Sequence, residues 1–397
     1  MSHEFYRIGL LPPYVFAEVN KIKAEARANG HDIIDFGMGN PDSKPPEHVV
    51  AKLKEVVDTD SKASRYSVSK GVFGLRKAQA AYYKRRFGIE LNPDTEICVS
   101  IGSKEGLATL ASAISKPGDV FVVPDPSYPI HVWGFKIPGA EVRTIPNDPH
   151  SPEFFDNVKK AFEQDPKPVA MVANYPCNPT AATVDIEFWT ELVAIAKHYG
   201  VYLISDLAYC EIYFDGKPTR SILEVPGAMD IAVEFTTVSK SYSMAGWRIG
   251  FAAGNKQLVG ALTKLKSYLD YGNFLPVQVA AAAALNGPQE YVQQMRDLYQ
   301  SRRDIMVQGL ADAGWEVDKP EASMFIWGKL PPTHEHLGSL EFSKQLLTHA
   351  DVAVAPGVGF GPGGENYVRI ALVENKQRIR QAIRGIKGYL SGKSAAA

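Results

Sequence analysis

Short apolar runs recur along the middle of the chain, separated by segments in which apolar residues have helical spacing. Runs of this length, bounded by turn-forming residues, are typical of buried strands. Strands that alternate with helices predict an α/β fold with a mostly parallel central sheet flanked by helices. The runs predicted to be strands are residues 97–101, 120–123, 169–173, 201–205, 233–238 and 249–253.

The two ends of the chain have a different pattern. Near the start, Pro12 and Pro13 interrupt any helix, and a helix is predicted to follow them. After a long amphipathic helix at 289–313, short strands alternate with helices, which predicts a smaller α+β unit. The predicted division is an N-terminal arm with part of the small domain at 1–44, a large domain at 45–285 and a small domain at 286–397.

Composition and charge narrow the choice of protein class. The chain has 397 residues, enough for two domains, with 45% hydrophobic and 22% charged residues, as in globular proteins. The formal net charge is −1, so the chain lacks the excess positive charge that would point to nucleic acid or an anionic membrane as a partner. No apolar run reaches the roughly 18 residues of a membrane helix. The first residues lack the pattern of a secretory signal, so we expect a cytoplasmic protein.

The three cysteines do not suggest a metal site. Cys98, Cys177 and Cys210 are odd in number and lack metal-ligand spacing. Reduced thiols and no bound metal are therefore expected. Cys177 and Cys210 lie next to candidate site residues, and packing is a simpler role for both than redox sensing.

Lys240 lies among small and hydroxyl residues between two predicted strands, so we place it in a turn at a strand end. Most lysines are solvated surface residues. In a desolvated pocket, however, a lysine becomes an amine nucleophile that can form a Schiff base. Arg248 follows eight positions later, and its planar guanidinium suits a phosphate. A lysine for an aldehyde and an arginine for a phosphate together suggest pyridoxal 5′-phosphate (PLP).

Other candidate residues follow strand ends, where open α/β sheets bind ligands. Asp206 is either the partner of a protonated pyridine nitrogen or the cap of a helix. Asn178 precedes a proline and either donates to a ring oxygen or forms an Asx turn. Tyr128 either stacks on a flat ring or packs in the core.

Several further segments have both a binding and a structural interpretation. Residues 102–106 join a strand to a helix N-terminus, which is an anion-binding layout. The phenol of Tyr66 could donate to a phosphate or only pack, and Gly39 could admit a ligand or only form a turn. Arg369 lies in an apolar strand and needs an anion, either a substrate α-carboxylate or a structural carboxylate. Tyr14 either reaches the site or anchors the arm.

The glycine-rich segment 356–364 superficially matches a dinucleotide-binding turn. Pro362 and paired glycines stand where a helix would have to begin, and too little chain follows for a complete βαβ unit. We therefore predict a flexible turn and no dinucleotide.

With these residues in view, the chain resembles the class I/II aminotransferases of PLP fold type I over nearly its whole length. The likeness is closest to bacterial glutamate–pyruvate (alanine) aminotransferases, which are similar to LL-diaminopimelate aminotransferases. The family's Asn-Pro-Thr-Gly reads Asn178-Pro179-Thr180-Ala181 here. The segments that carry the likeness are 11–14 (Leu-Pro-Pro-Tyr), 37–42 (Gly-Met-Gly-Asn-Pro-Asp), 102–106 (Gly-Ser-Lys-Glu-Gly) and 239–242 (Ser-Lys-Ser-Tyr).

The resemblance implies a role for each candidate residue. Lys240 would bind PLP covalently and shuttle a proton, and Asp206 would pair with the ring nitrogen. Tyr66 would reach the phosphate of the neighbouring subunit, which implies a homodimer with shared sites. The other implied cofactor contacts are Tyr128 on the ring, Asn178 and Tyr209 on the ring oxygen, and Ser103, Lys104, Ser239 and Arg248 on the phosphate. The implied substrate contacts are Arg369, Gly39 and Asn178, with Tyr14, Lys104 and Asn273 toward the variable part of the substrate.

The activity implied by the resemblance is amino transfer between L-alanine/pyruvate and L-glutamate/2-oxoglutarate by a ping-pong mechanism. One alternative is a PLP aminotransferase for aspartate, aromatic amino acids, methionine or LL-diaminopimelate. Another is a PLP lyase or decarboxylase. A third is a non-catalytic regulator built on an aminotransferase-like domain, which would need a fused DNA-binding domain that we do not expect in this chain.

Overall fold

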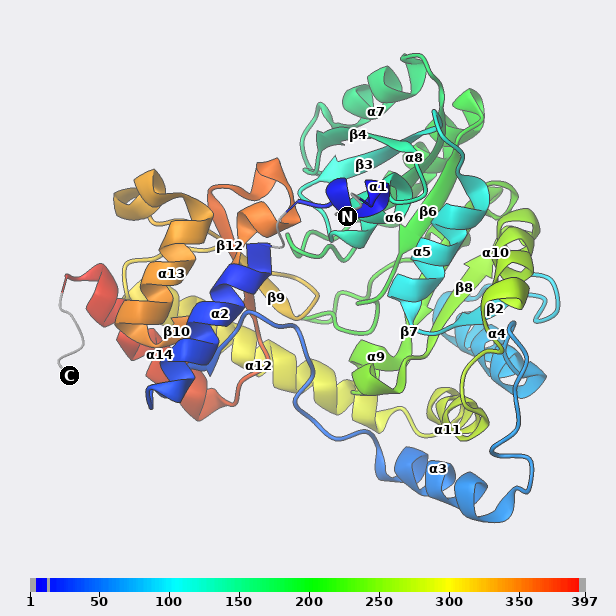
Figure 1. Ribbon diagram of the computed structural model, residues 1–397, viewed down its shortest axis with the longest axis horizontal. Coiled ribbons are helices and arrows are strands. Elements are labelled where there is room, and N and C mark those ends of the chain that lie inside the picture. Colours follow the sequence, from blue (N-terminus) through cyan, green and yellow to red (C-terminus); the bar gives the residue numbers. More distant parts are fainter. Residues whose placement is uncertain (1–4, 13–14, 393–397) are drawn as a thin grey trace.

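A seven-stranded sheet forms the centre of the computed structural model, which describes residues 5–12 and 15–392 (Figure 1). All its strands point the same way except β8, which runs antiparallel to both neighbours. The predicted α/β fold with a mostly parallel sheet is confirmed. In spatial order the strands are β2 (Ile97–Ser100), β8 (Gly250–Gly254), β7 (Ala232–Thr237), β6 (Tyr202–Asp206), β5 (Pro168–Ala173), β3 (Val120–Asp125) and β4 (Glu141–Pro146).

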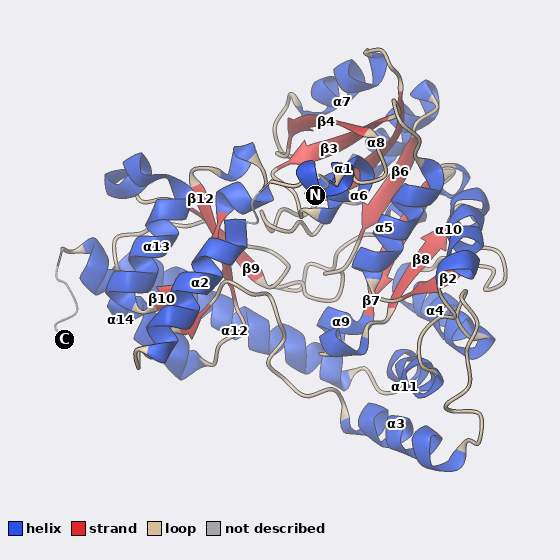
Figure 2. Cartoon of the chain, in the orientation of Figure 1, coloured by secondary structure: helices blue, strands red, loops and turns tan. Residues whose placement is uncertain are grey.

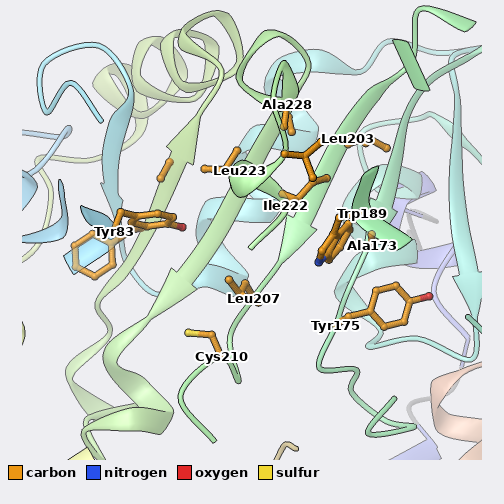
Figure 3. Packing of buried hydrophobic residues seen from close by; sticks show 14 of the residues in the cluster. Tyr83, Ala173, Tyr175, Trp189, Leu203, Leu207, Cys210, Ile222, Leu223 and Ala228 are labelled. Atoms are coloured by element: carbon orange, nitrogen blue, oxygen red, sulfur yellow. The ribbon is translucent and has the colours of Figure 1, made fainter. Parts of the chain in front are cut away.

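Helices cover both faces of this sheet, as Figure 2 shows. Side chains of a strand alternate between the faces, so Leu203 joins one buried cluster and its neighbour Ile204 the other. Figure 3 shows the first cluster, in which the rings of Trp189 and Tyr175 pack edge-on. Helices α4 (Phe73–Phe87), α7 (Phe154–Glu163), α8 (Ile186–Tyr199) and α11 (Leu275–Asn286) cover this face, and α5 (Ser103–Ile114), α6 (Ile130–Lys136) and α10 (Lys256–Leu269) cover the other.

A second core lies beside the large sheet (Figure 1). It contains the antiparallel sheet β11 (Ala355–Pro356), β12 (Tyr367–Ala371) and β9 (Phe325–Lys329). Strand β1 (Ile34–Asp35) pairs with β10 (Val352–Ala353), which ties the predicted arm to the C-terminal part. The helices around this core are α2 (Val15–Ala28), α12 (Glu290–Asp312), α13 (Gly338–Ala350) and α14 (Lys376–Leu390). The remaining helices are α1 (Tyr6–Gly9), α3 (Glu47–Thr59) and α9 (Val238–Ser241).

Two local expectations were wrong. Lys240 lies in the one-turn helix α9 and not in an open turn, because Thr237 caps that turn by accepting the N–H of Ser239. The aromatic residues and the proline at 268–278 predict a connection without helix, but α10 continues to Leu269 and α11 begins at Leu275. Proline is acceptable there because Pro276 lies in the first turn of α11, where its missing N–H costs nothing.

Candidate active site

The carboxyl ends of β3, β5, β6 and β7 meet at one edge of the sheet and open into a cavity of about 220 Å³. Strand β9 and the turn after β1 close the cavity from the side of the second core. Most residues singled out from the sequence line it together. They are Gly39, Ser103, Lys104, Tyr128, Asn178, Asp206, Tyr209, Ser239, Lys240, Arg248 and Arg369.

Lys240 points into this cavity from α9, directly after strand β7. Its Nζ donates a hydrogen bond to the carbonyl oxygen of Gly39 at 2.7 Å. Burial, with smaller contributions from the cations Arg369 and Arg248, lowers the pKa of Lys240 to about 8. About a tenth of the side chain is therefore the neutral amine at pH 7, far more than for an ordinary lysine, and this is the form that attacks a carbonyl or takes a proton.

Asp206 ends strand β6 and is buried. One carboxylate oxygen, Oδ2, lies 3.0 Å from Nε2 of the buried His131. The other, Oδ1, is also buried and has no hydrogen-bond partner within residues 5–12 and 15–392. A buried carboxylate oxygen without a donor is costly, so this atom needs a cationic N–H donor such as a protonated pyridine nitrogen.

Arg248 and the N-terminus of α5 form the cationic end of the cavity. The guanidinium lies against Gly102, where a Cβ would meet Nη2 at 2.1 Å, so only glycine leaves room for it. Arg248 donates to the carbonyls of Ala245 and Ile101, and no carboxylate pairs with it in the described chain. The free N–H groups at the start of α5, at Ser103, add partial positive charge. This end fits a phosphate group.

Arg369 lies on the opposite side, in strand β12. It donates to Oδ1 of Asn178 at 2.7 Å and to the carbonyl of Gly37 at 2.9 Å. The rings of Phe325 and Phe360 lie 4.2 and 4.7 Å from its Cζ. The guanidinium is thus held at the cavity wall with its plane fixed by two aromatic rings, an arrangement that suits a planar carboxylate.

The two tyrosines predicted near the cofactor ring both line the cavity. Tyr209 is buried and packs edge-on against Phe325. Burial raises the pKa of Tyr209 far above its ordinary value, so its phenol stays protonated and can donate. Tyr128 packs edge-on against His131 with ring centroids 6.0 Å apart.

The structure does not bring every predicted residue to this cavity. Tyr66 is 86% exposed and packs on Tyr271, away from its own chain's cavity. Asn273 is buried beneath Arg248 and donates to its backbone carbonyl at 2.5 Å. The predicted contact of Tyr14 lies outside the described residues.

Sequence reasoning missed His131 and Phe325. His131 lies in α6, three residues after Tyr128, and no local pattern distinguishes it from a core histidine. Phe325 contacts both Arg369 and Tyr209, and a Cβ on Gly39 would meet its ring at 2.7 Å. That close approach explains the glycine, whose predicted role was to admit a ligand.

The departure at Ala181 keeps the turn geometry of a glycine. Its φ is 60°, in the left-handed region, and its N–H donates to the carbonyl of Cys177. Alanine in this conformation costs roughly 1 kcal/mol. The neighbouring Asn178 still reaches Arg369, so the substitution leaves the site intact.

A second cavity of about 140 Å³ adjoins the first. The two share Met38, Lys104, Tyr128 and Arg369. Its walls include Phe16 of α2 and Phe360, so much of its surface is apolar. This space extends from Arg369 toward helix α2.

Two further findings concern the described residues only. They contain no group of three or more acidic, histidine or cysteine residues that could hold a metal ion. None of their helices is both long and apolar enough to cross a bilayer.

The fold, the buried lysine, the unpartnered Asp206 oxygen and the cationic end that fits a phosphate define a PLP enzyme of fold type I. Residues 31–386 match the family described as aminotransferase class I and II, and the chain belongs to that family. Its cofactor is PLP.

Known proteins similar to the chain include two aminotransferases and one solved structure. It is 51% identical to the glutamate-pyruvate aminotransferase AlaC of Escherichia coli (strain K12), covering 97% of this chain and 93% of that protein. It is 40% identical to the LL-diaminopimelate aminotransferase of Moorella thermoacetica, covering 98% of each. The structure of substrate-bound BacF from Bacillus subtilis superposes with a TM-score of 0.90 at 33% identity, covering 98% of each chain.

Proposed function

We propose that this aminotransferase moves an amino group between L-alanine/pyruvate and L-glutamate/2-oxoglutarate. The observation that carries the chemistry is the placement of the partly neutral Lys240 amine and the Arg369 guanidinium around one cavity. The 51% identity to a glutamate-pyruvate aminotransferase supports this choice of substrates.

The residues divide the work among them. When bound, PLP supplies an electron-poor ring that accepts the electron pair left when the substrate Cα loses its proton. Asp206 keeps a proton on the ring nitrogen, and His131 orients the carboxylate. Arg369 binds the substrate α-carboxylate and so presents the Cα–H bond to Lys240. Lys240, as a neutral amine, takes the Cα proton as a general base. As the ammonium ion so formed, it then gives the proton back as a general acid.

The substrate side chain would extend from Arg369 into the second cavity. Lys104 lines both cavities, is exposed, and has its Nζ 5.5 Å from the Tyr128 ring centroid. No carboxylate pairs with Lys104 in the part of the chain described, so it can meet the side-chain carboxylate of glutamate. Alanine needs no such partner.

A longer substrate is the second candidate. The adjoining cavity of about 140 Å³ offers more room than a methyl group uses. A relative at 40% identity is an LL-diaminopimelate aminotransferase, so we propose this amino acid as the alternative donor.

A spectroscopic experiment tests the proposal. The visible absorption band of bound PLP should fall when L-alanine is added and return when 2-oxoglutarate follows. Lys240→Ala should show no such cycle. If the band is present but only LL-diaminopimelate changes it, the alternative donor is correct. If no band forms with added PLP, the role of Lys240 is wrong.

We further propose a homodimer with shared sites and a cytoplasmic location. The exposed Tyr66 and Tyr271 form an aromatic pair on the surface. Tyr268, Leu269 and Phe274, which are near Tyr271 in the sequence, are exposed as well. Exposed apolar and aromatic side chains of this kind suit contact with a second copy of the chain. The three cysteines are unpaired and buried, which supports a reducing compartment. Light scattering after gel filtration measures the dimer.

A further inference from the structure

The glycine-rich segment 357–364 lies against the end of strand β3. It consists of two short 3-10 helices, Gly357–Phe360 and Pro362–Gly364. The N–H of Gly363 donates to Oδ2 of Asp125 at 2.8 Å. In the opposite direction, the N–H of Ser127 donates to the carbonyl of Phe360 at 2.8 Å. These two bonds join the end of β3 in the large sheet to the turn that precedes β12.

Glycine is required where the carboxylate of Asp125 enters the turn. A Cβ on Gly361 would lie 1.8 Å from Oδ1, and the φ of this residue is 124°, which side chains disfavour. A Cβ on Gly363 would lie 3.0 Å from Oδ2. Asp125 is half-buried; burial raises its pKa, and the Gly363 N–H opposes that rise. The contact is therefore close, directional and partly shielded from water.

The same turn carries Phe360 to Arg369. Phe360 is 4% exposed, and its ring centroid lies 4.7 Å from Arg369 Cζ. Phe16 and Trp327 pack edge-on against it at 5.4 and 6.0 Å, which fixes the ring. One segment thus contacts the guanidinium on one side and Asp125, three residues before Tyr128, on the other.

We propose that residues 357–364 act as a clasp and that Asp125 is a positioning residue for the substrate α-carboxylate. Asp125 does not line the cavity; it acts through Gly363 and Phe360. By anchoring the turn to the end of β3, it holds Phe360 against Arg369 and fixes the guanidinium relative to Tyr128. The inference rests on the proposed role of Arg369 in carboxylate binding.

The test uses the PLP-loaded enzyme and four variants. Asp125→Ala removes the acceptor, and Asp125→Asn keeps an oxygen that can accept the Gly363 N–H. Gly361→Ala places a methyl group against the carboxylate. Gly314→Ala is the matched control, because Gly314 also has a positive φ, 84°, but nothing lies within 4 Å of its Cβ position. Calorimetry measures the Kd of 2-oxoglutarate, which has no amino group to transfer to the PLP form, and kinetics give kcat and KM for L-alanine.

We expect Asp125→Ala to raise the Kd and the KM about fivefold, the size of one lost hydrogen bond, with a smaller change in kcat. Asp125→Asn should restore most of the affinity, and Gly361→Ala should weaken binding more than Gly314→Ala does. If Gly361→Ala does not fold, the comparison of Asp125→Ala with Asp125→Asn tests the proposal without it.

Unchanged Kd and KM in Asp125→Ala would overturn the clasp while leaving the proposed function in place. The same conclusion follows if Gly314→Ala weakens binding as much as Gly361→Ala. A wild-type enzyme that neither binds 2-oxoglutarate nor exchanges with L-alanine would instead refute the proposed substrates, and the clasp with them.

Discussion

His131 lies 3.0 Å from one oxygen of the Asp206 carboxylate, and the other oxygen has no hydrogen-bond partner among the described residues. Both side chains are buried, so water cannot substitute for either partner. The histidine therefore fixes the direction of the carboxylate that we propose pairs with the ring nitrogen of PLP.

Replacing His131 by alanine should weaken this alignment. We expect Kd for PLP to rise and kcat to fall, each about tenfold, because a buried charge-assisted hydrogen bond is lost. Fluorescence titration of the cofactor-free protein and steady-state kinetics measure the two effects. The exposed His198→Ala serves as control, and equal losses in both variants would contradict the assignment.

Lys240 should give the cofactor-free protein a distinctive pH dependence. Burial lowers its pKa from 10.5 to about 8 in the folded chain. Between these values the unfolded chain binds the proton and the folded chain does not, so the free energy of unfolding should rise with pH from about 8 to 10.5. Urea titrations across this range should show that slope in the wild type and a smaller one in Lys240→Met. Identical slopes would show that the amine is not desolvated.

Lys104 should discriminate between substrates. Lys104→Gln removes the cation proposed to meet the glutamate side chain, so KM for L-glutamate and 2-oxoglutarate should rise about tenfold. KM for L-alanine should change less than twofold, since alanine has no side-chain carboxylate. Parallel kinetics with both amino donors measure the split. A uniform loss for both donors would instead place Lys104 on the cofactor phosphate.

Glu234 should make stability fall as pH rises toward neutrality. It is fully buried and accepts hydrogen bonds from Tyr83, Ser205, Ser221 and the N–H of Ile222. Burial outweighs these donors and raises its pKa from 4.5 to about 7. Between these two pKa values the folded chain keeps a proton that the unfolded chain has released. The free energy of unfolding therefore falls by on the order of 3 kcal/mol as the pH rises from 4.5 to about 7. Glu234→Gln should flatten the slope in urea titrations; an unchanged slope would assign it to other groups.

Shared sites can be tested by mixing inactive variants. Tyr66→Ala and Lys240→Ala homodimers should each have little activity. If Tyr66 completes the partner's site, a mixed dimer has one site with both changes and one with neither. Unfolding and refolding the two together should therefore recover roughly a quarter of wild-type activity. No recovery, with dimers present by light scattering, would place Tyr66 outside the partner's site.

Much of the site could be predicted from the sequence because Asp206 ends strand β6, while Asn178 and Lys240 lie in the short segments that follow β5 and β7. The carboxyl ends of parallel strands meet at one edge, so local patterns already imply that these residues converge. The spacing of Lys240 and Arg248 added the phosphate end. These predictions needed only the direction of each strand.

Other features depended on contacts far apart in the sequence. His131 lies 75 residues from Asp206, and no spacing rule links a helix residue to a strand end. Phe325 is defined as a site residue only by its contact with Arg369. Lys240 was predicted to lie in a turn, but it lies in a single helical turn. That turn depends on the capping bond of Thr237, which the hydrophobic pattern does not show. The partner contact of Tyr66 concerns a second chain and remains a prediction.

The turn after β1 has a consequence of its own. The carbonyl of Gly37 accepts a hydrogen bond from Arg369. Two residues later, the carbonyl of Gly39 accepts one from Lys240. The proposed substrate recognition by Arg369 and the proposed proton transfer by Lys240 therefore depend on one short piece of backbone. A mutation at Met38 that shifts this backbone would alter both at once, so the segment offers little freedom to evolve a new substrate preference without changing turnover. Such freedom lies instead at Lys104 and along the walls that α2 contributes to the second cavity.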